Sequence, residues 1–178
     1  MSVARDDVMM PTPESEGRQM VGTKKRVKRI SELRWTVGLE PGLVRRDDET
    51  GQWWFPLGAV ACLTTMCPWQ IIAEGGVALA SGDEGQWYGL SEPVDAAARA
   101  TELLAGREVV DASLVEASSE LEIELQGGIA IRTFNDSSGH EGWDLYGPDG
   151  AHWTQQGGTV HRAVRVGENS YRMMKTGW

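Results

Sequence analysis

Apolar and polar residues alternate along much of the chain from Leu33 to Val160, which is typical of strands with one buried and one solvated face. The clearest run is 120–125, where three glutamates alternate with three aliphatic residues. A period of two places the glutamates on one face of a strand and the aliphatic side chains on the other. The pattern predicts a mainly β fold of the α+β class.

Two segments of the chain repeat one another. Residues 69–80 and 121–132 each read as a strand, two consecutive glycines (from Gly75 and from Gly127) and a second strand. Glycine adopts positive φ without steric cost, so each segment predicts a tight hairpin. A fainter third copy has its glycines from Gly157. Neither hairpin could bury its apolar face alone, so we expect two halves of one sheet system, related by an approximate twofold.

One segment between the two hairpins has the composition of a helix. Ser91 can cap it, Pro93 suits its first turn, and Gly106 is placed to end it. We therefore expect the longest helix of the chain over residues 92–105. Its packing stripe should consist of apolar positions, namely Val94, Ala97, Ala98 and Leu104.

The length of 178 residues suits one domain of ordinary size. Residues 1–30 carry scattered charges without an apolar period, which predicts a disordered tail. We expect residues 31–160 to form a single β-rich domain and residues 161–178 to form a basic extension that could be a hairpin.

No apolar run is long enough to span a membrane, and the first residues lack a secretory signal. Cys62 and Cys67 lack the spacing of a redox or zinc motif. We therefore expect a soluble cytoplasmic protein.

The net charge of −9 conceals a strong asymmetry. Residues 47–160 hold 19 acids against three arginines, whereas both flanking segments are basic. Such an acidic body repels nucleic-acid phosphate and attracts basic proteins. The run Lys24–Arg29 is the one place where nucleic acid or another anion could bind, and a solvated linker is the alternative interpretation.

Candidate chemistry is sparse. His140 and Glu141 could serve a hydrolase or a metal, but no motif with two histidines surrounds them, so we expect no metal and no cofactor. Acid–base catalysis by a pair of carboxylates needs two different pKa values, and carboxylates in similar environments do not have them. This argues against a catalytic role for the three glutamates. We interpret them as a docking ridge for a basic partner. Further acids along the chain could extend that ridge: Glu120, Glu122 and Glu124 are joined by Asp136, Glu141 and Asp144.

Tryptophans are the remaining candidates, since the chain has eight of them and only two phenylalanines. They could anchor a partner, because indole offers a large contact area at small entropic cost, or they could fill the core of a small β domain. Trp53 and Trp54 are consecutive and cannot both face inward on a regular strand. We select Trp53 and Trp143 as candidate contact residues.

Residues 57–160 resemble a family of short actinobacterial proteins known only as domain of unknown function 6188. The resemblance rests on a leucine–glycine start in each half, on the run HEGWDLYGPDG at 140–150, and on the closing glycines from Gly157. His140 and Gln156 stand where that family has tyrosine and proline, and a terminal tryptophan is missing. The resemblance implies a compact β-rich domain and no catalytic residues. Some similar small acidic proteins are immunity or antitoxin partners.

The leading hypothesis is a non-enzymatic acidic module of the immunity or antitoxin type, which inhibits a basic toxin or nuclease. The first alternative is a module that binds a small ligand or another protein through exposed tryptophans. The second alternative is a hydrolase that uses His140 and Glu141.

Overall fold

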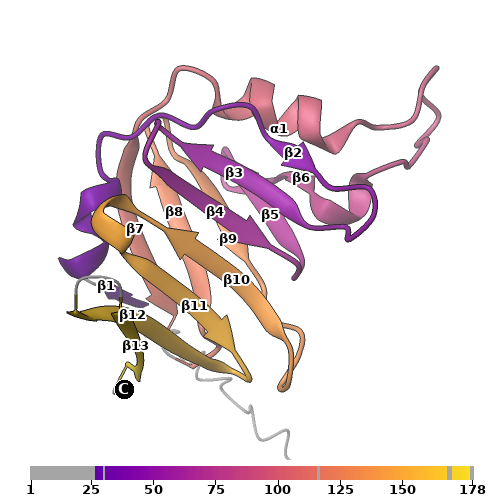
Figure 1. The fold of residues 1–178 in the computed structure, drawn as a ribbon. Coiled ribbons are helices and arrows are strands. Elements are labelled where there is room, and N and C mark those ends of the chain that lie inside the picture. Colours follow the sequence, from indigo (N-terminus) through magenta and orange to yellow (C-terminus); the bar gives the residue numbers. More distant parts are fainter. Residues whose placement is uncertain (1–26, 30, 116, 168–169, 177–178) are drawn as a thin grey trace, which may run out of the picture.

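The computed structural model describes residues 27–29, 31–115, 117–167 and 170–176, so most of the expected N-terminal tail lies outside the described residues. Two antiparallel sheets face each other and enclose the core between them, as Figure 1 shows. The mainly β fold of the α+β class is confirmed. Among the described residues, no helix is long and apolar enough to cross a membrane.

The first sheet contains both of the predicted hairpins. In spatial order its strands are β1 (Val27–Arg29), β7 (Val109–Val115), β8 (Glu120–Leu125), β9 (Ile129–Thr133), β5 (Trp69–Ala73) and β6 (Gly76–Ala80). Strand β1 pairs with β7 along the edge of this sheet. Residues 27–29, for which the sequence predicts a disordered tail, are therefore part of the fold.

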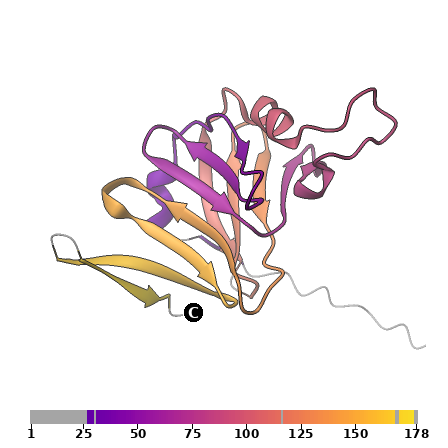
Figure 2. The same cartoon turned by 45° about the vertical axis from the view of Figure 1, so that its right-hand side comes forward.

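The second sheet was not separately predicted. In spatial order its strands are β13 (Ser170–Lys175), β12 (Thr159–Gly167), β11 (His152–Gln156), β10 (Glu141–Tyr146), β4 (Ala61–Thr65), β3 (Trp53–Leu57) and β2 (Arg45–Arg46). The basic extension for which the sequence allowed a hairpin is the β12–β13 hairpin, which projects at the lower left of Figure 2.

The two echoed hairpins lie side by side, because β9 pairs with β5. Equivalent positions pair in both, Ile71 with Leu79 and Ile123 with Ile131, and all four side chains are buried. The strand order β8-β9-β5-β6 repeats the hairpin by a sideways shift across the sheet. A twofold axis between the hairpins would place equivalent strands next to each other, either the two first strands or the two second strands. Here the second strand of one hairpin, β9, pairs with the first strand of the other, β5, so the expected twofold relation is wrong.

The glycine turns differ in detail. In the β5–β6 hairpin the turn residues with positive φ are Glu74 and Gly75, and the extra residue is taken up as a register shift after Ile71. In the β8–β9 hairpin the extra residue lies in a three-residue loop instead, since Leu125 pairs with Ile129. The two-residue Gly-Gly turn occurs only in the third copy, at positions 157 and 158, where φ is 56° and 72°.

Helix α1 (Ala96–Leu104) is the longest helix among the described residues, as predicted. Asp95 caps it by accepting the backbone N–H of Ala98 at 2.8 Å, in place of Ser91. The buried positions recur every fourth residue at Ala96, Ala100 and Leu104, and Val94 precedes them. Ala98 is exposed, so its predicted place in the packing stripe is wrong.

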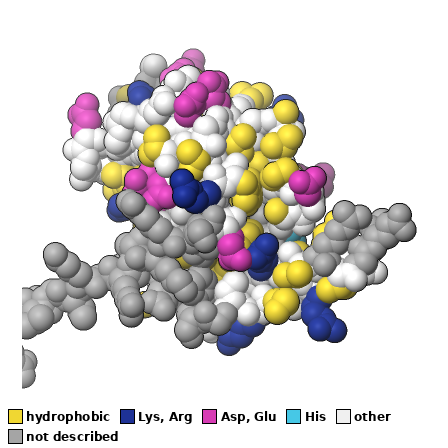
Figure 3. All heavy atoms as spheres, turned by 90° about the vertical axis from the view of Figure 1, so that its left-hand side faces the viewer, with side chains coloured by type: hydrophobic (Ala, Val, Ile, Leu, Met, Phe, Trp, Pro, Cys, Tyr) yellow, Lys and Arg dark blue, Asp and Glu magenta, His cyan; other side chains and the backbone are white. Residues whose placement is uncertain are grey.

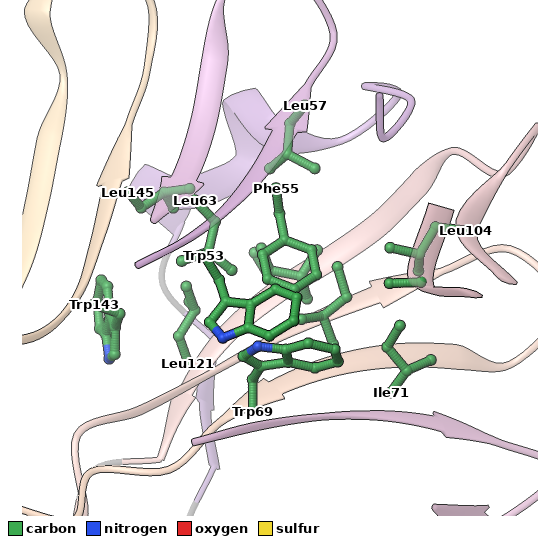
Figure 4. Close-up of a cluster of buried hydrophobic side chains, with 14 of the residues drawn as sticks. Trp53, Phe55, Leu57, Leu63, Trp69, Ile71, Leu104, Leu121, Trp143 and Leu145 are labelled. Carbon is green, nitrogen blue, oxygen red and sulfur yellow. The ribbon is translucent and has the colours of Figure 1, made fainter. Parts of the chain in front are cut away.

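The described residues also form three short 3-10 helices, η1 (Ser31–Thr36), η2 (Ser81–Asp83) and η3 (Pro148–Gly150). Between the sheets, an aromatic cluster forms the centre of the core (Figure 4). The Trp69 ring from the first sheet meets the rings of Trp53 and Phe55 from the second sheet edge-on, with centroids 4.8 and 5.1 Å apart. Such edge-to-face pairs add to the stabilisation from burial of apolar area. The cluster therefore holds the two layers together.

Candidate functional site

The predicted acidic ridge lies on the outer face of the first sheet, as the alternation in β8 indicated. Glu120, Glu122 and Glu124 are all partly buried there, while Leu121 and its inward neighbours are fully buried. Glu122 is not a free carboxylate, because its side chain pairs with Arg132 of β9. The ridge is thus partly neutralised within the protein.

A shallow hollow of about 400 Å³ lies over this ridge, at the turn end of the two hairpins. Its lining combines charged side chains of β8 and β9 with apolar and glycine positions, among them Glu122, Glu124, Arg132, Ile72, Ala130 and Gly128. The floor is an open sheet surface with charges of both signs. Figure 3 shows another side of the molecule, where acidic and basic side chains are also interspersed around a group of hydrophobic ones.

The remaining predicted acids do not extend the ridge. Glu141 and Asp144 belong to β10 in the second sheet, and Asp136 lies in the connection between β9 and β10. Within β10, Trp143 is buried between the sheets, so Asp144 points to the opposite outer surface of the sandwich. The expectation of a continuous patch from β8 to Asp144 is therefore wrong.

Asp144 instead belongs to a small polar cluster on the second sheet. Its Oδ1 lies 2.8 Å from Nε2 of His152, and the His152 ring stacks on Tyr146 with centroids 4.4 Å apart. Burial, followed by the negative charges of Asp144 and Glu141, raises the pKa of Tyr146. The sequence carried a signal for this cluster, since Asp144 and His152 occupy outward positions on two strands joined by a short turn.

Nucleophilic chemistry has little support in this cluster. Cys62 is the register partner of Tyr146, but burial raises the pKa of its thiol and so disfavours the reactive thiolate. His140 and Glu141 are both exposed, and neither side chain hydrogen-bonds to another described residue. In the part of the chain that the structure describes, no group of three potential metal ligands occurs.

Four of the seven tryptophans that the structure describes are buried in the core: Trp53, Trp69, Trp143 and Trp153. Trp53 and Trp143 are 4% and 1% exposed, and Trp143 Nε1 donates a hydrogen bond to the carbonyl oxygen of Ser119 at 2.9 Å. They cannot contact a partner, so their selection as contact residues is wrong. Trp54 points outward with 43% exposure, which confirms that only one of the two consecutive tryptophans faces the core.

Trp54 lines a second shallow hollow of about 450 Å³ at the edge of the second sheet. The other lining residues are Arg45, Arg46, Asp47 and Pro56. Arg45 is the register partner of Trp54, and an indole beside an arginine suits a flat, negatively charged ligand. The Arg46 guanidinium lies instead 5.8 Å from the centroid of the Trp53 ring.

Among the described residues, the two most exposed aromatic side chains lie elsewhere, in residues 84–93, which we call the aromatic loop. This loop joins η2 to α1 and projects from the body at the upper right of Figures 1 and 2. Trp87, Tyr88 and Leu90 are 59%, 68% and 51% exposed. The sequence did not single out Trp87. The predicted hairpin ends at residue 80, and the exposure of the residues that follow depends on how they pack in the assembled fold.

Backbone hydrogen bonds close the base of the aromatic loop. Gly85 N–H donates to the Val94 carbonyl oxygen at 2.9 Å, and Val94 N–H donates to that of Gln86 at 2.8 Å. Tyr88 has a φ of +39°, a conformation that side-chain-bearing residues seldom adopt. Strain of this kind persists where the surroundings fix the backbone, and it concentrates at functional sites.

Carboxylates support the loop from both sides. Asp83 accepts the Tyr88 hydroxyl at 2.9 Å, and this hydrogen bond is the main reason that the pKa of Tyr88 is raised. Glu84 accepts the Ala96 N–H at 2.8 Å, which ties the loop to the start of α1. Since residues 81–98 contain no lysine or arginine, the loop presents its aromatic side chains in a negative field.

Comparison of the chain with protein-family models, with curated proteins and with solved structures finds no match in any of the three. The resemblance to domain of unknown function 6188 thus stays a hypothesis.

Proposed function

We propose that the protein is a non-enzymatic module that binds a basic protein, with the aromatic loop as its main contact. The observation that carries this proposal is the exposure of Trp87, Tyr88 and Leu90 on a braced, projecting loop. Binding energy at protein interfaces concentrates in a few tryptophan and tyrosine side chains. A loop that is already ordered loses little conformational entropy on binding.

Charge supports a basic partner. The loop contains Glu84 and Glu92, is flanked by Asp83 and Asp95, and belongs to a strongly acidic body. A negative field accelerates the encounter with a basic surface, while the apolar contacts hold the complex. An inhibitor of the immunity or antitoxin type would use this arrangement to cover the basic substrate-binding surface of a toxin or nuclease.

Affinity capture followed by measurement on the purified pair tests the proposal. Proteins retained by the wild type are compared with those retained by a Trp87→Ala/Tyr88→Ala variant and by a Trp54→Ala variant, which is the matched control. We expect one stoichiometric basic protein that is lost with the loop variant and kept with the control. For the purified pair, the association rate should fall steeply as salt is added. Undiminished binding by the loop variant would contradict the proposal.

A second candidate function is the binding of a small planar anion at Trp54, which the hollow beside this tryptophan and its register partner Arg45 favours. The same two variants separate the candidates. A ligand in this hollow would quench tryptophan fluorescence in the wild type and in the loop variant, but much less in Trp54→Ala. Equal quenching in Trp54→Ala would contradict this candidate.

A further inference from the structure

The outer edge of the second sheet ends at β13, whose backbone has a partner on one side only. Strand β12 pairs with it along residues 161–167, and among the described strands none pairs with its other side. We propose that two copies of the protein form a dimer in which their β13 strands pair antiparallel about Met173. This inference is independent of the proposed function.

Hydrogen-bond directions select the residues that are available for such pairing. Thr176 N–H donates to the Val160 carbonyl oxygen at 3.0 Å, so at this residue the backbone faces β12. Backbone groups alternate between the two sides along an antiparallel strand. Positions 172 and 174 therefore also face β12, while the N–H and C=O groups of Tyr171, Met173 and Lys175 face outward.

A twofold axis at Met173 brings these outward groups into register. Met173 then pairs with Met173 of the second copy, and Tyr171 pairs with Lys175 of the second copy. Each is a hydrogen-bonded pair of the antiparallel type. An axis at Tyr171 or Lys175 would leave part of the strand without a partner, so Met173 is the centre that aligns its whole length.

Side chains favour this register as well. Like charges directly opposite each other on neighbouring strands are destabilising. With the axis at Met173, Arg172 lies opposite Met174 and Lys175 lies opposite Tyr171, so no two cations meet. A lysine beside a tyrosine ring can also make a cation–π contact. Parallel in-register pairing would instead place Arg172 and Lys175 each beside the same residue of the second copy, so that like charges meet.

The exposed apolar residues of the hairpin supply the driving force. Tyr171, Met173 and Met174 are 50%, 46% and 50% exposed, and all six residues of β13 are exposed. An edge strand of this composition tends to pair with another strand. Basic residues on an edge strand can also prevent pairing, which is the competing interpretation of Arg172 and Lys175. The two interpretations predict different masses in solution, that of a dimer if β13 pairs and that of a monomer if the basic residues prevent pairing.

Cysteine cross-linking tests the register. Met173→Cys would place two thiols across the axis with Cα atoms about 5.5 Å apart, within the range of a disulfide. Met174→Cys is the matched control, because its two copies would lie about 8 Å apart, beyond that range. With copper phenanthroline as the added oxidant, we expect a covalent dimer from Met173→Cys. We expect at least about 10-fold less from Met174→Cys and from the wild type, which retains Cys62 and Cys67.

Light scattering without cross-linking supplies a second measurement. The wild type should pass from the monomer mass of 19.5 kDa to twice that mass as its concentration rises. Tyr171→Lys, which creates two lysine–lysine pairs, should stay monomeric, while Tyr171→Phe should dimerise like the wild type. A wild type that remains monomeric at concentrations on the order of 100 µM, or equal cross-linking at positions 173 and 174, would overturn the proposal.

Discussion

Trp53 and Trp69 meet edge-on with ring centroids 4.8 Å apart and ring planes at 79°, and each belongs to a different sheet. The contact joins the two layers at the centre of the core, where Trp69 is fully buried. We predict that Trp69→Ala lowers the free energy of unfolding by about 3–5 kcal/mol. Trp54→Ala, on an exposed position of the same sheet as Trp53, should change it by only about 0.5 kcal/mol. Urea denaturation of the two variants checks this, and similar losses would contradict it.

The pairing of Glu122 with Arg132 gives the ridge a structural role that the alternation pattern did not reveal. Glu122→Gln should lower the free energy of unfolding by about 0.5–1 kcal/mol at low salt, the upper range for an exposed pair. The difference from the wild type should shrink in concentrated salt, because salt screens the attraction. Glu124→Gln is the control on the same face. A loss that salt does not reduce would show that Glu122 acts through packing.

The hydrogen bond from Tyr88 to Asp83 predicts a linked titration. The carboxylate stabilises the protonated hydroxyl, so the pKa of Tyr88 lies above the ordinary value of 10.0. Asp83→Asn should return this pKa toward 10.0. The pKa of Tyr146, which is raised by a different environment, should stay where it is and serves as an internal control. NMR of labelled tyrosine rings during an alkaline titration measures both, and an unchanged Tyr88 would contradict the described bracing.

Both cysteines should behave as protected thiols. Burial raises the pKa of Cys62 and Cys67 above the ordinary value of 9.0. The folded protein then holds these protons more tightly than the unfolded chain, so stability is retained below pH 9.0 and falls as the pH rises through the folded-state values. Thiol labelling should be slow in the native protein and fast in urea. Cys67→Ala should reduce the alkaline loss of stability, and a fast native reaction at Cys67 would contradict its burial.

Local patterns sufficed where a structural feature depends on one strand or one turn. Alternation correctly placed the three glutamates of β8 outside and separated Trp53 from Trp54, because side-chain direction follows directly from the period of a strand. The helix between the hairpins was found for a similar reason. The sequence did not correctly predict its capping residue or the exposure of Ala98, since both depend on which face of α1 meets the sheets.

Features that depend on the pairing of distant strands could not be predicted. Alternation says that Asp144 and Glu122 both point outward from their strands, but not that these strands belong to opposite sheets. The repeat predicted two hairpins but could not show whether a rotation or a sideways shift relates them, because this depends on the pairing of β9 with β5. The aromatic loop escaped notice because exposure is a property of the assembled fold.

The sideways relation between the two hairpins makes the first sheet open-ended. A twofold rotation relates only two hairpins, because a second rotation returns to the first one. A sideways shift can be repeated, and a third hairpin would then pair with the outer edge of β6. In this chain β6 is followed by η2, which begins at Ser81, and by the aromatic loop, not by a third hairpin. A duplication of the 69–80 unit would therefore extend the first sheet beyond β6 by the same kind of pairing that joins β9 to β5.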